Sequence, residues 1–129
     1  MFTTLPELES VVAKQAREPN GGLIVLPEAF LILHRAEVTS LAARYSLPAV
    51  YPYRQFPEIG GLLSYGFDRL ENWRRAASYV DRILKGEKPG DLPVQTPTKY
   101  DLVINLKTAK TLGLTISREL QLRADEVIE

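Results

Sequence analysis

The stretch VYPYRQFPEIGGLLSYG, residues 50–66, gathers the side chains best suited to holding a small molecule. Tyr51, Tyr53 and Phe56 offer flat apolar rings for stacking, and the tyrosines add a hydroxyl for hydrogen bonding. Arg54 lies among them, and a guanidinium can pair bidentately with a carboxylate. This pattern is suited to one wall of a ligand cleft. The alternative is that Tyr51 and Phe56 fill the core while Arg54 lies on the surface.

A second group follows the apolar run LIVLP, where Glu28, Ala29 and Phe30 lead into a predicted helix. Backbone N–H groups at a helix start can hold a carboxylate, and Phe30 would offer its ring to the ligand side chain. In the alternative interpretation, Phe30 packs under the next loop and Glu28 complements the helix dipole.

Small residues complete the predicted site. Gly60 and Gly61 permit positive φ and a close approach of the backbone to a ligand, and Ser64 can donate one hydrogen bond. The same residues would also serve a turn, a bulge or a local cap. The predicted ligand contacts are Glu28, Ala29, Phe30, Tyr51, Tyr53, Arg54, Gly60, Gly61 and Ser64.

Catalytic and metal-binding patterns are missing from the sequence. It has no cysteine and one histidine, His34, and it lacks phosphate-binding glycine loops, a G-x-S-x-G elbow and H-E-x-x-H. His34 follows Phe30 by one helical turn on an apolar stripe, which favours a structural role. We therefore expect no catalysis, no metal and no cofactor. A small isomerase or hydrolase is the weakest alternative, with Glu58 or His34 as its base.

Composition narrows the class of protein further. The 129 residues are 45% hydrophobic, which suits one domain with a packed core, and 16 Lys+Arg balance 16 Asp+Glu. This balance argues against a nucleic-acid partner, because such a protein needs a basic face. Glu7 and Glu9 interrupt the start of the chain where a signal peptide would be basic and then apolar. No stretch approaches the roughly 20 apolar residues of a membrane span.

Strand patterns alternate with helix patterns along the chain. Short apolar runs predict strands over 23–26, 47–51, 61–64 and 100–104, and helical spacing predicts helices over 5–17, 30–45, 68–84, 105–112 and 117–127. This order favours an α/β three-layer sandwich with a mainly parallel sheet. Ligands bind outside the carboxyl ends of such strands, so the loops 27–30 and 52–60 should share one functional edge.

The predicted helix over 68–84 has the clearest apolar face. Its apolar residues recur every three or four positions, and they are Leu70, Trp73, Ala77, Val80 and Leu84. We expect this face, with Trp73 in it, to be buried as core.

The order of three segments carries a family resemblance. GGLIVLPEAF, then LAARYSLPAVYPYRQFPEIGGLLSYG, then YVDRILKGEKPGDLPVQTPTKYDLVINLKTAKTLGL resembles the C-terminal part of substrate-binding proteins of ABC transporters, in the tryptophan- and tyrosine-type branch. The resemblance covers about residues 16–129. It implies one lobe of a type I periplasmic-binding-protein-like fold: residues 1–129 as a single α/β domain equivalent to the C-terminal lobe, with 89–129 as the segment that returns to the hinge.

The resemblance also implies a function and partners. Family members are longer, and they hold a small-molecule ligand between two lobes before docking to a membrane permease, in the periplasm or at the envelope. The resemblance implies that this chain is a solute-binding component or a truncated lobe, and that it binds a small amino-acid-like or aromatic ligand. Its implied partners are the missing N-terminal lobe or the ABC permease. Apolar surface left bare, above all over 89–114, predicts a homodimer, with domain swapping as one route. The alternative is a stand-alone dimerising sensor or interaction domain with no transport role.

Overall fold

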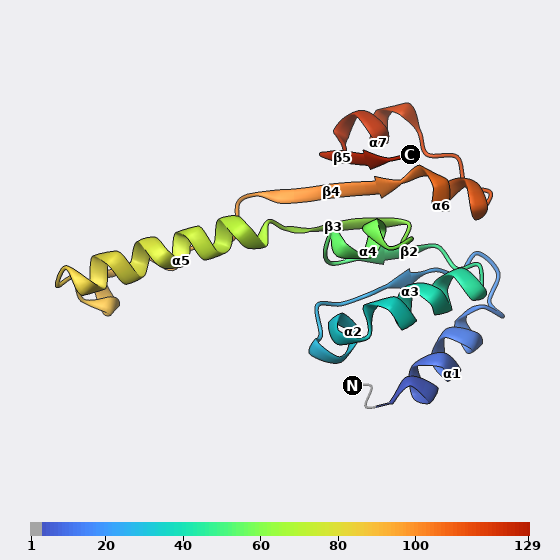
Figure 1. The fold of residues 1–129 in the computed structure, drawn as a ribbon, viewed down its shortest axis with the longest axis horizontal. Coiled ribbons are helices and arrows are strands. Elements are labelled where there is room, and N and C mark those ends of the chain that lie inside the picture. Colours follow the sequence, from blue (N-terminus) through green and yellow to red (C-terminus); the bar gives the residue numbers. More distant parts are fainter. Residues whose placement is uncertain (1–3) are drawn as a thin grey trace. The chain divides into compact units, whose positions relative to one another are not determined.

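The computed structural model describes residues 4–129 and divides the chain into two compact units (Figure 1). The described residues up to Gly66, together with Asp101–Glu129, form the first unit, and Phe67–Tyr100 form the second. The segment 89–129, predicted to return to the hinge, contributes to both units. Its role in a single C-terminal lobe stays a prediction.

The described chain forms a five-stranded sheet whose strands follow one another in sequence order. The strands are β1 Leu23–Ile24, β2 Ala49–Tyr51, β3 Leu63–Phe67, β4 Tyr100–Asn105 and β5 Glu126–Ile128. β1 pairs with β2, β2 with β3 and β4 with β5, each in parallel. Parallel neighbours require a crossover between them, and helices supply most of these connections. The predicted α/β class with a mainly parallel sheet is confirmed.

Four of the six helices described in the first unit begin at a polar side chain that caps them. The six are α1 Leu5–Gln15, α2 Ala29–Leu33, α3 Arg35–Arg44, α4 Gln55–Glu58, α6 Leu106–Thr111 and α7 Arg118–Arg123. Asn105 and Ser117 accept hydrogen bonds from the N–H groups three residues later, at 2.9 and 3.2 Å, which satisfies free donors of α6 and α7. The helix predicted over 30–45 divides at His34, whose backbone leaves the helical region at φ −97° and ψ 33°.

One core cluster supports β1 and β2 and the helices around them. It draws on α1, α2, α3 and the loops after the strands, and its members are Leu8, Val12, Val25, Leu31, Val38, Leu41, Ala42, Leu47, Ala49, Tyr51 and Phe56. Burying a large apolar side chain of this kind stabilises a fold by about 1.5–3 kcal/mol. Phe30 and Tyr53 pack against the cluster from its margin. The core therefore fixes the two loops in which the predicted site lies.

The second unit consists of α5 Arg69–Leu84, a 3-10 helix at Pro89–Asp91 and an extended return. The return lies along one face of α5, because the Tyr79 hydroxyl donates to the Pro93 carbonyl and Arg75 Nη1 donates to the Thr96 carbonyl at 3.1 Å. Positive φ at Gly86, 101°, lets the chain reverse after the helix.

The apolar stripe of α5 is exposed. None of the helix residues is buried, and Trp73 and Leu84 are 69% and 82% exposed. The prediction that Trp73 belongs to the core is wrong for this structure. Helical spacing correctly marks an apolar face, but the Phe67–Tyr100 unit contains no element that covers it.

Asp68 caps α5 and gives the helix a pH dependence. Its Oδ1 accepts from the N–H groups of Leu70 and Glu71, and Lys99 Nζ donates to its Oδ2 at 2.9 Å. The hydrogen bond from Lys99 and those from the backbone lower the pKa of the carboxyl. A lowered folded pKa means that this stabilisation is present above the unfolded pKa and is lost as pH falls through the folded value.

We therefore expect the first turn of α5 to fray on acidification below about pH 4, the ordinary range of an aspartate. The amide resonances of Leu70 and Glu71, followed by NMR through an acid titration, measure this change. Asp68→Asn keeps the capping oxygen without the titrating charge, so its first turn should change much less with pH. Identical titrations of the two proteins would contradict the assignment.

Candidate functional site

The candidate site lies at the edge where β1 and β2 end. Because the two strands are parallel, with Leu23 paired to Ala49, the loops that follow them emerge at the same edge. Glu28 caps α2, and its Oε2 accepts from the Leu31 N–H at 3.3 Å. Ala29, the first helical residue, is exposed. A ligand carboxylate gripped at this turn, as the sequence predicts, would therefore have to displace the carboxylate of the protein itself.

Phe30 and Tyr53 are partly buried aromatic residues at this edge. Both pack against the core cluster, and each leaves part of its ring surface accessible. The Phe30 ring also contacts His34, with centroids 4.5 Å apart and planes tilted by 48°. Their contact with a ligand stays a prediction, and the packing of Phe30 against the core also agrees with the alternative interpretation of that residue.

Arg54 is already engaged in ion pairs. Its Nε donates to Glu58 Oε1 at 3.0 Å, and its Nη2 donates to Glu126 Oε2 at 2.5 Å, which ties the loop after β2 to β5. The hydrogen bond with Glu58 and the charge of Glu126 raise the pKa of the guanidinium. The side chain is 49% exposed, so solvent screens these pairs. A ligand carboxylate could join Arg54 only in competition with two carboxylates.

Three other predicted contacts lie inside the fold. Tyr51 and Ser64 are paired across β2 and β3, and each is 1% exposed. The Tyr51 ring stacks on Phe56 at 4.7 Å, and burial raises the pKa of its hydroxyl to about 12. Gly61 is buried too, and a Cβ there would come within 2.7 Å of the Tyr51 ring. In this structure these residues support the loops from beneath and present almost no surface to a ligand.

Gly60 lies at a separate hollow. It has φ 104°, and its carbonyl accepts from Thr108 Oγ1 at 2.9 Å. It lines a pocket of about 410 Å³ together with residues mostly of α3: Leu33, Arg35, Ala36, Thr39, Ser40, Ala43 and Ile59. None of the other eight predicted contacts lines this pocket. The structure thus does not bring Gly60 together with the edge that holds Phe30 and Tyr53.

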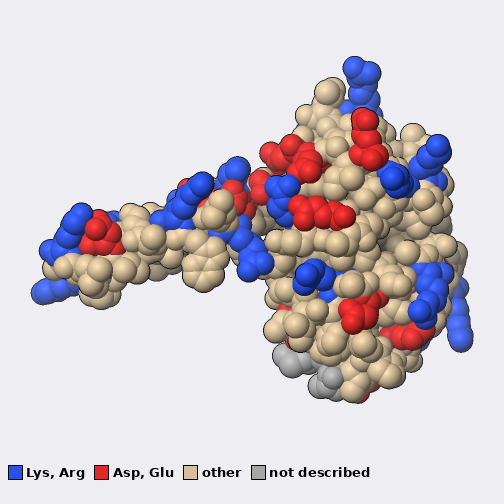
Figure 2. Space-filling model, viewed as in Figure 1, with Lys and Arg blue, Asp and Glu red and all other residues tan. Residues whose placement is uncertain are grey.

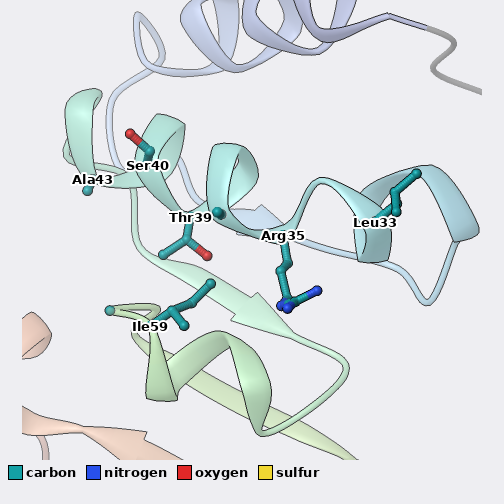
Figure 3. Close-up of a pocket in the computed structure, with 8 residues that line it drawn as sticks. Leu33, Arg35, Thr39, Ser40, Ala43 and Ile59 are labelled. Atoms are coloured by element: carbon teal, nitrogen blue, oxygen red, sulfur yellow. The ribbon is translucent and has the colours of Figure 1, made fainter.

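Sequence reasoning missed the three polar side chains of this pocket, those of Arg35, Thr39 and Ser40. Figure 3 shows Arg35 and Thr39 directed from α3 toward the side on which Ile59 lies. Thr39 is buried, and its Oγ1 has no hydrogen-bond partner within residues 4–129, although the hydroxyl lies near enough to Tyr51 to offset part of that residue's pKa rise. No motif marks these positions in the sequence, because only the approach of Ile59 to α3 makes them a pocket.

The residues considered for catalysis are held in local pairs. His34 Nδ1 lies 3.4 Å from Glu37 Oε1, and Glu58 pairs with Arg54. Within residues 4–129, no group of three His, Cys, Asp or Glu side chains could hold a metal ion. In the same range, no helix combines the length and apolar character needed to span a bilayer.

Open parallel sheets bind ligands outside the carboxyl ends of their strands, and small-molecule sites are lined largely by apolar and aromatic side chains. The family model of ABC transporter substrate-binding proteins matches residues 1–128, and the chain belongs to this family. The predicted resemblance is thereby confirmed. No curated protein sequence matches the chain.

Solved structures agree with this assignment. A conserved domain protein from Vibrio cholerae has a TM-score of 0.84 and 27% identity. The match covers 96% of this chain and 42% of the Vibrio cholerae chain. An ABC domain from Streptococcus pneumoniae, in complex with L-Trp, has a TM-score of 0.83 and 26% identity, over 97% of this chain and 43% of its own. The third structure is the ligand-free, open form of a substrate-binding protein from Clostridium difficile, with a TM-score of 0.66 and 20% identity. The match covers 98% of this chain and 42% of that chain, and it supports the fold alone.

The chain therefore spans less than half the length of the structures that it resembles. The predicted fold class, a three-layer α/β sandwich forming one lobe of a type I periplasmic-binding-protein-like fold, is confirmed by these neighbours together with the observed sheet.

Proposed function

We propose that this chain forms one wall of the ligand site of an ABC transporter solute receptor that binds a small aromatic or amino-acid-like molecule. The observation that carries the proposal is membership of the substrate-binding family over residues 1–128. The relative from Streptococcus pneumoniae in complex with L-Trp supports the ligand class. Two partly buried rings at one edge, Phe30 and Tyr53, leave some surface that is suited to such a ligand.

The proposal gives each predicted contact a role. Phe30 and Tyr53 stack on the ligand side chain. Glu28 has one carboxylate oxygen committed to the Leu31 N–H, and its other oxygen can accept from a ligand ammonium group. Arg54 holds the ligand carboxylate by exchanging it for Glu58 or Glu126. Ala29 lets the ligand approach the backbone, and the buried or pocket-lining members, Tyr51, Gly60, Gly61 and Ser64, keep the loops in place.

A second wall is part of the proposed mechanism. Small ligands are mostly enclosed when bound, and an edge of partly buried rings encloses one side only. The other lobe of a longer receptor would supply the second wall, and closure over the ligand would precede docking to the permease. In this proposal the protein acts in the periplasm or at the envelope, uses no cofactor and performs no chemistry.

Titration of the ¹⁵N-labelled chain with L-Trp tests the proposal. We expect saturable shifts with a dissociation constant on the order of 1 mM, because one wall makes few contacts. Phe30→Ala and Tyr53→Ala should each weaken binding about tenfold, whereas Trp73→Ala, which removes an exposed ring in the other unit, should leave it unchanged. Binding that is equal in all four proteins would contradict this site.

The exposed stripe of α5 favours a second candidate, the stand-alone dimerising domain. Its apolar side chains are exposed along one face of the helix, and contiguous exposed apolar surface on a soluble protein often marks an interaction site. In this candidate the chain is a sensor or interaction module that forms a homodimer. The dimer is domain-swapped if the two copies exchange the extended return of the second unit. Light scattering that finds a stable dimer, unchanged by saturating L-Trp, would favour this candidate over the receptor lobe.

A further inference from the structure

The apolar stripe of α5 is as wide as that of a helix facing a protein core. At 100° per residue, its apolar positions fall within an arc of about 140°. All are exposed, and they are Leu70, Trp73, Ala76, Ala77, Val80, Ile83 and Leu84. Arg69, the first helical residue, is the one charged residue of α5 within this arc. A stripe this wide packs on several elements at once, whereas a coiled-coil partner contacts a narrower seam.

The extended return of the second unit covers a different side of α5. Arg75 and Tyr79 donate to the carbonyls of Thr96 and Pro93, so the return lies against their side of the helix. At 100° per residue, these two positions point at least about 100° away from the middle of the stripe. The stripe is therefore a separate surface, and Figure 2 shows uncharged surface between the acidic and basic side chains along this helix.

A hollow beside Trp73 adds relief to this surface. Its volume is about 320 Å³, and its lining residues, all in the second unit, are Phe67, Arg69, Asn72, Trp73 and Ala76. Well-packed interfaces insert anchoring side chains into hollows of this kind. The surface of α5 is thus shaped to receive another packed body.

The structures that resemble this chain contain the additional length that such a body needs. The matches to the Vibrio cholerae and Streptococcus pneumoniae proteins include 96% and 97% of this chain, so they cannot leave out the second unit as a whole. They take up only 42% and 43% of those proteins. More than half of each relative therefore lies outside the match and is available to cover α5.

We propose that the second lobe of the receptor packs on the apolar stripe of α5, so that residues 67–100 belong to the core of that lobe. This inference rests on the proposed two-lobed receptor and names the surface that joins this chain to the other lobe. The chain leaves the first unit after Gly66 and returns to it at Asp101, and near both points the Asp68 N–H donates to the Lys99 carbonyl at 3.0 Å. Two adjacent crossing segments let one chain contribute a ligand-site wall and a helix of the opposite lobe.

A thiol placed in the stripe reports whether the second lobe covers it, because the chain has no cysteine of its own. Val80→Cys puts the thiol in the middle of the stripe, and Ser78→Cys puts it about 160° around the helix. Each variant is measured as the isolated chain and in a chimera. In the chimera this chain replaces the matched part of the Streptococcus pneumoniae protein, and any cysteine of the added part is changed to serine.

Both thiols should react rapidly with DTNB in the isolated chain. In the chimera the thiol of Val80→Cys should react at least about tenfold more slowly, because a buried thiol reacts only when its surroundings open, whereas that of Ser78→Cys should keep its rate. Trp73→Glu should lower the urea midpoint of the chimera and leave that of the isolated chain unchanged. Ser78→Glu adds the same charge on the opposite side of α5 and should change neither midpoint.

Equal rates for the two thiols in the chimera would overturn the proposal. Slow reaction of the Val80→Cys thiol in the isolated chain, together with a dimer in light scattering, would also overturn it and make a second copy the occupant. The thiol rates are measured without ligand, so they are independent of the L-Trp titration. A failure of that titration would count against the wall around Phe30 and Tyr53 and leave the lobe contact standing.

Discussion

Gly66→Ala is expected to destabilise the first unit by at least about 3 kcal/mol, because the added Cβ would lie 1.9 Å from the carbonyl oxygen of Pro52. It would also come within 3.0 Å of the Pro52 carbonyl carbon. Both are backbone atoms, so no side-chain rotation can relieve the clash, and the fixed φ of proline limits movement of that loop. The loop that carries Tyr53 would have to shift away from β3.

Urea unfolding followed by far-ultraviolet circular dichroism measures this loss. Gly90→Ala is the matched control, since no heavy atom of the described chain lies within 4 Å of the Cβ that it adds, and its stability should change by less than about 0.5 kcal/mol. Equal midpoints for the two variants would show that β3 does not approach Pro52 as closely as the structure has it.

Phe56→Ala is expected to cost about 3–5 kcal/mol in the free energy of unfolding, the usual range for removing a buried ring. Phe56 is 1% exposed and stacks on Tyr51, so its removal opens a cavity beneath the loop after β2. The same loss would loosen Tyr53 and Arg54, which this loop positions. Ligand affinity should therefore fall together with stability.

Phe30→Ala provides the comparison for Phe56→Ala. The same ring is removed from a half-buried position at the margin of the core, so the loss should be less than half as large. Thermal or urea unfolding of the two variants side by side gives the ratio. If Phe30→Ala were the more damaging, Phe30 would belong to the core and would be a poor candidate for a ligand contact.

The sequence predicts most of this fold because its signals are local. Apolar runs bounded by glycine and proline mark β1 and β2, and YDLVI marks β4 to within one residue. Capping residues locate the starts of α5 and α7. Each of these signals lies within a few residues of the helix or strand that it specifies, so periodicity and turn chemistry suffice to locate that element.

The sequence does not predict two elements, β5 and α4, and the reason differs between them. β5 was predicted as the end of a helix, but Asp125 accepts from the Leu102 N–H at 2.8 Å and starts a strand beside β4 instead. α4 is a four-residue helix containing Pro57, a length that periodicity cannot reveal. A tertiary contact therefore outweighs local preference at β5, whereas the short length of α4 hides it from periodicity.

The candidate site also combines features that the sequence predicts with features that only the folded chain decides. That Tyr53 lies near the rim, or that Tyr51 is buried, does not follow from the run VYPYR, since both are tyrosines beside a strand end. The stack of Tyr51 on Phe56 and the pairing of Arg54 with Glu126 decide the matter, and both require the folded chain. For Trp73, spacing identifies an apolar face but says nothing of what covers it.

The central claim is that the edge after β1 and β2 forms one wall of a ligand site, and the location of the L-Trp response tests it most directly. In the titration of the ¹⁵N-labelled chain, the largest shifts should fall on the amides of Glu28, Ala29, Phe30 and Tyr53. Shifts concentrated instead on Arg35, Thr39 and Gly60, around the pocket of Figure 3, would contradict the claim and place the ligand against α3.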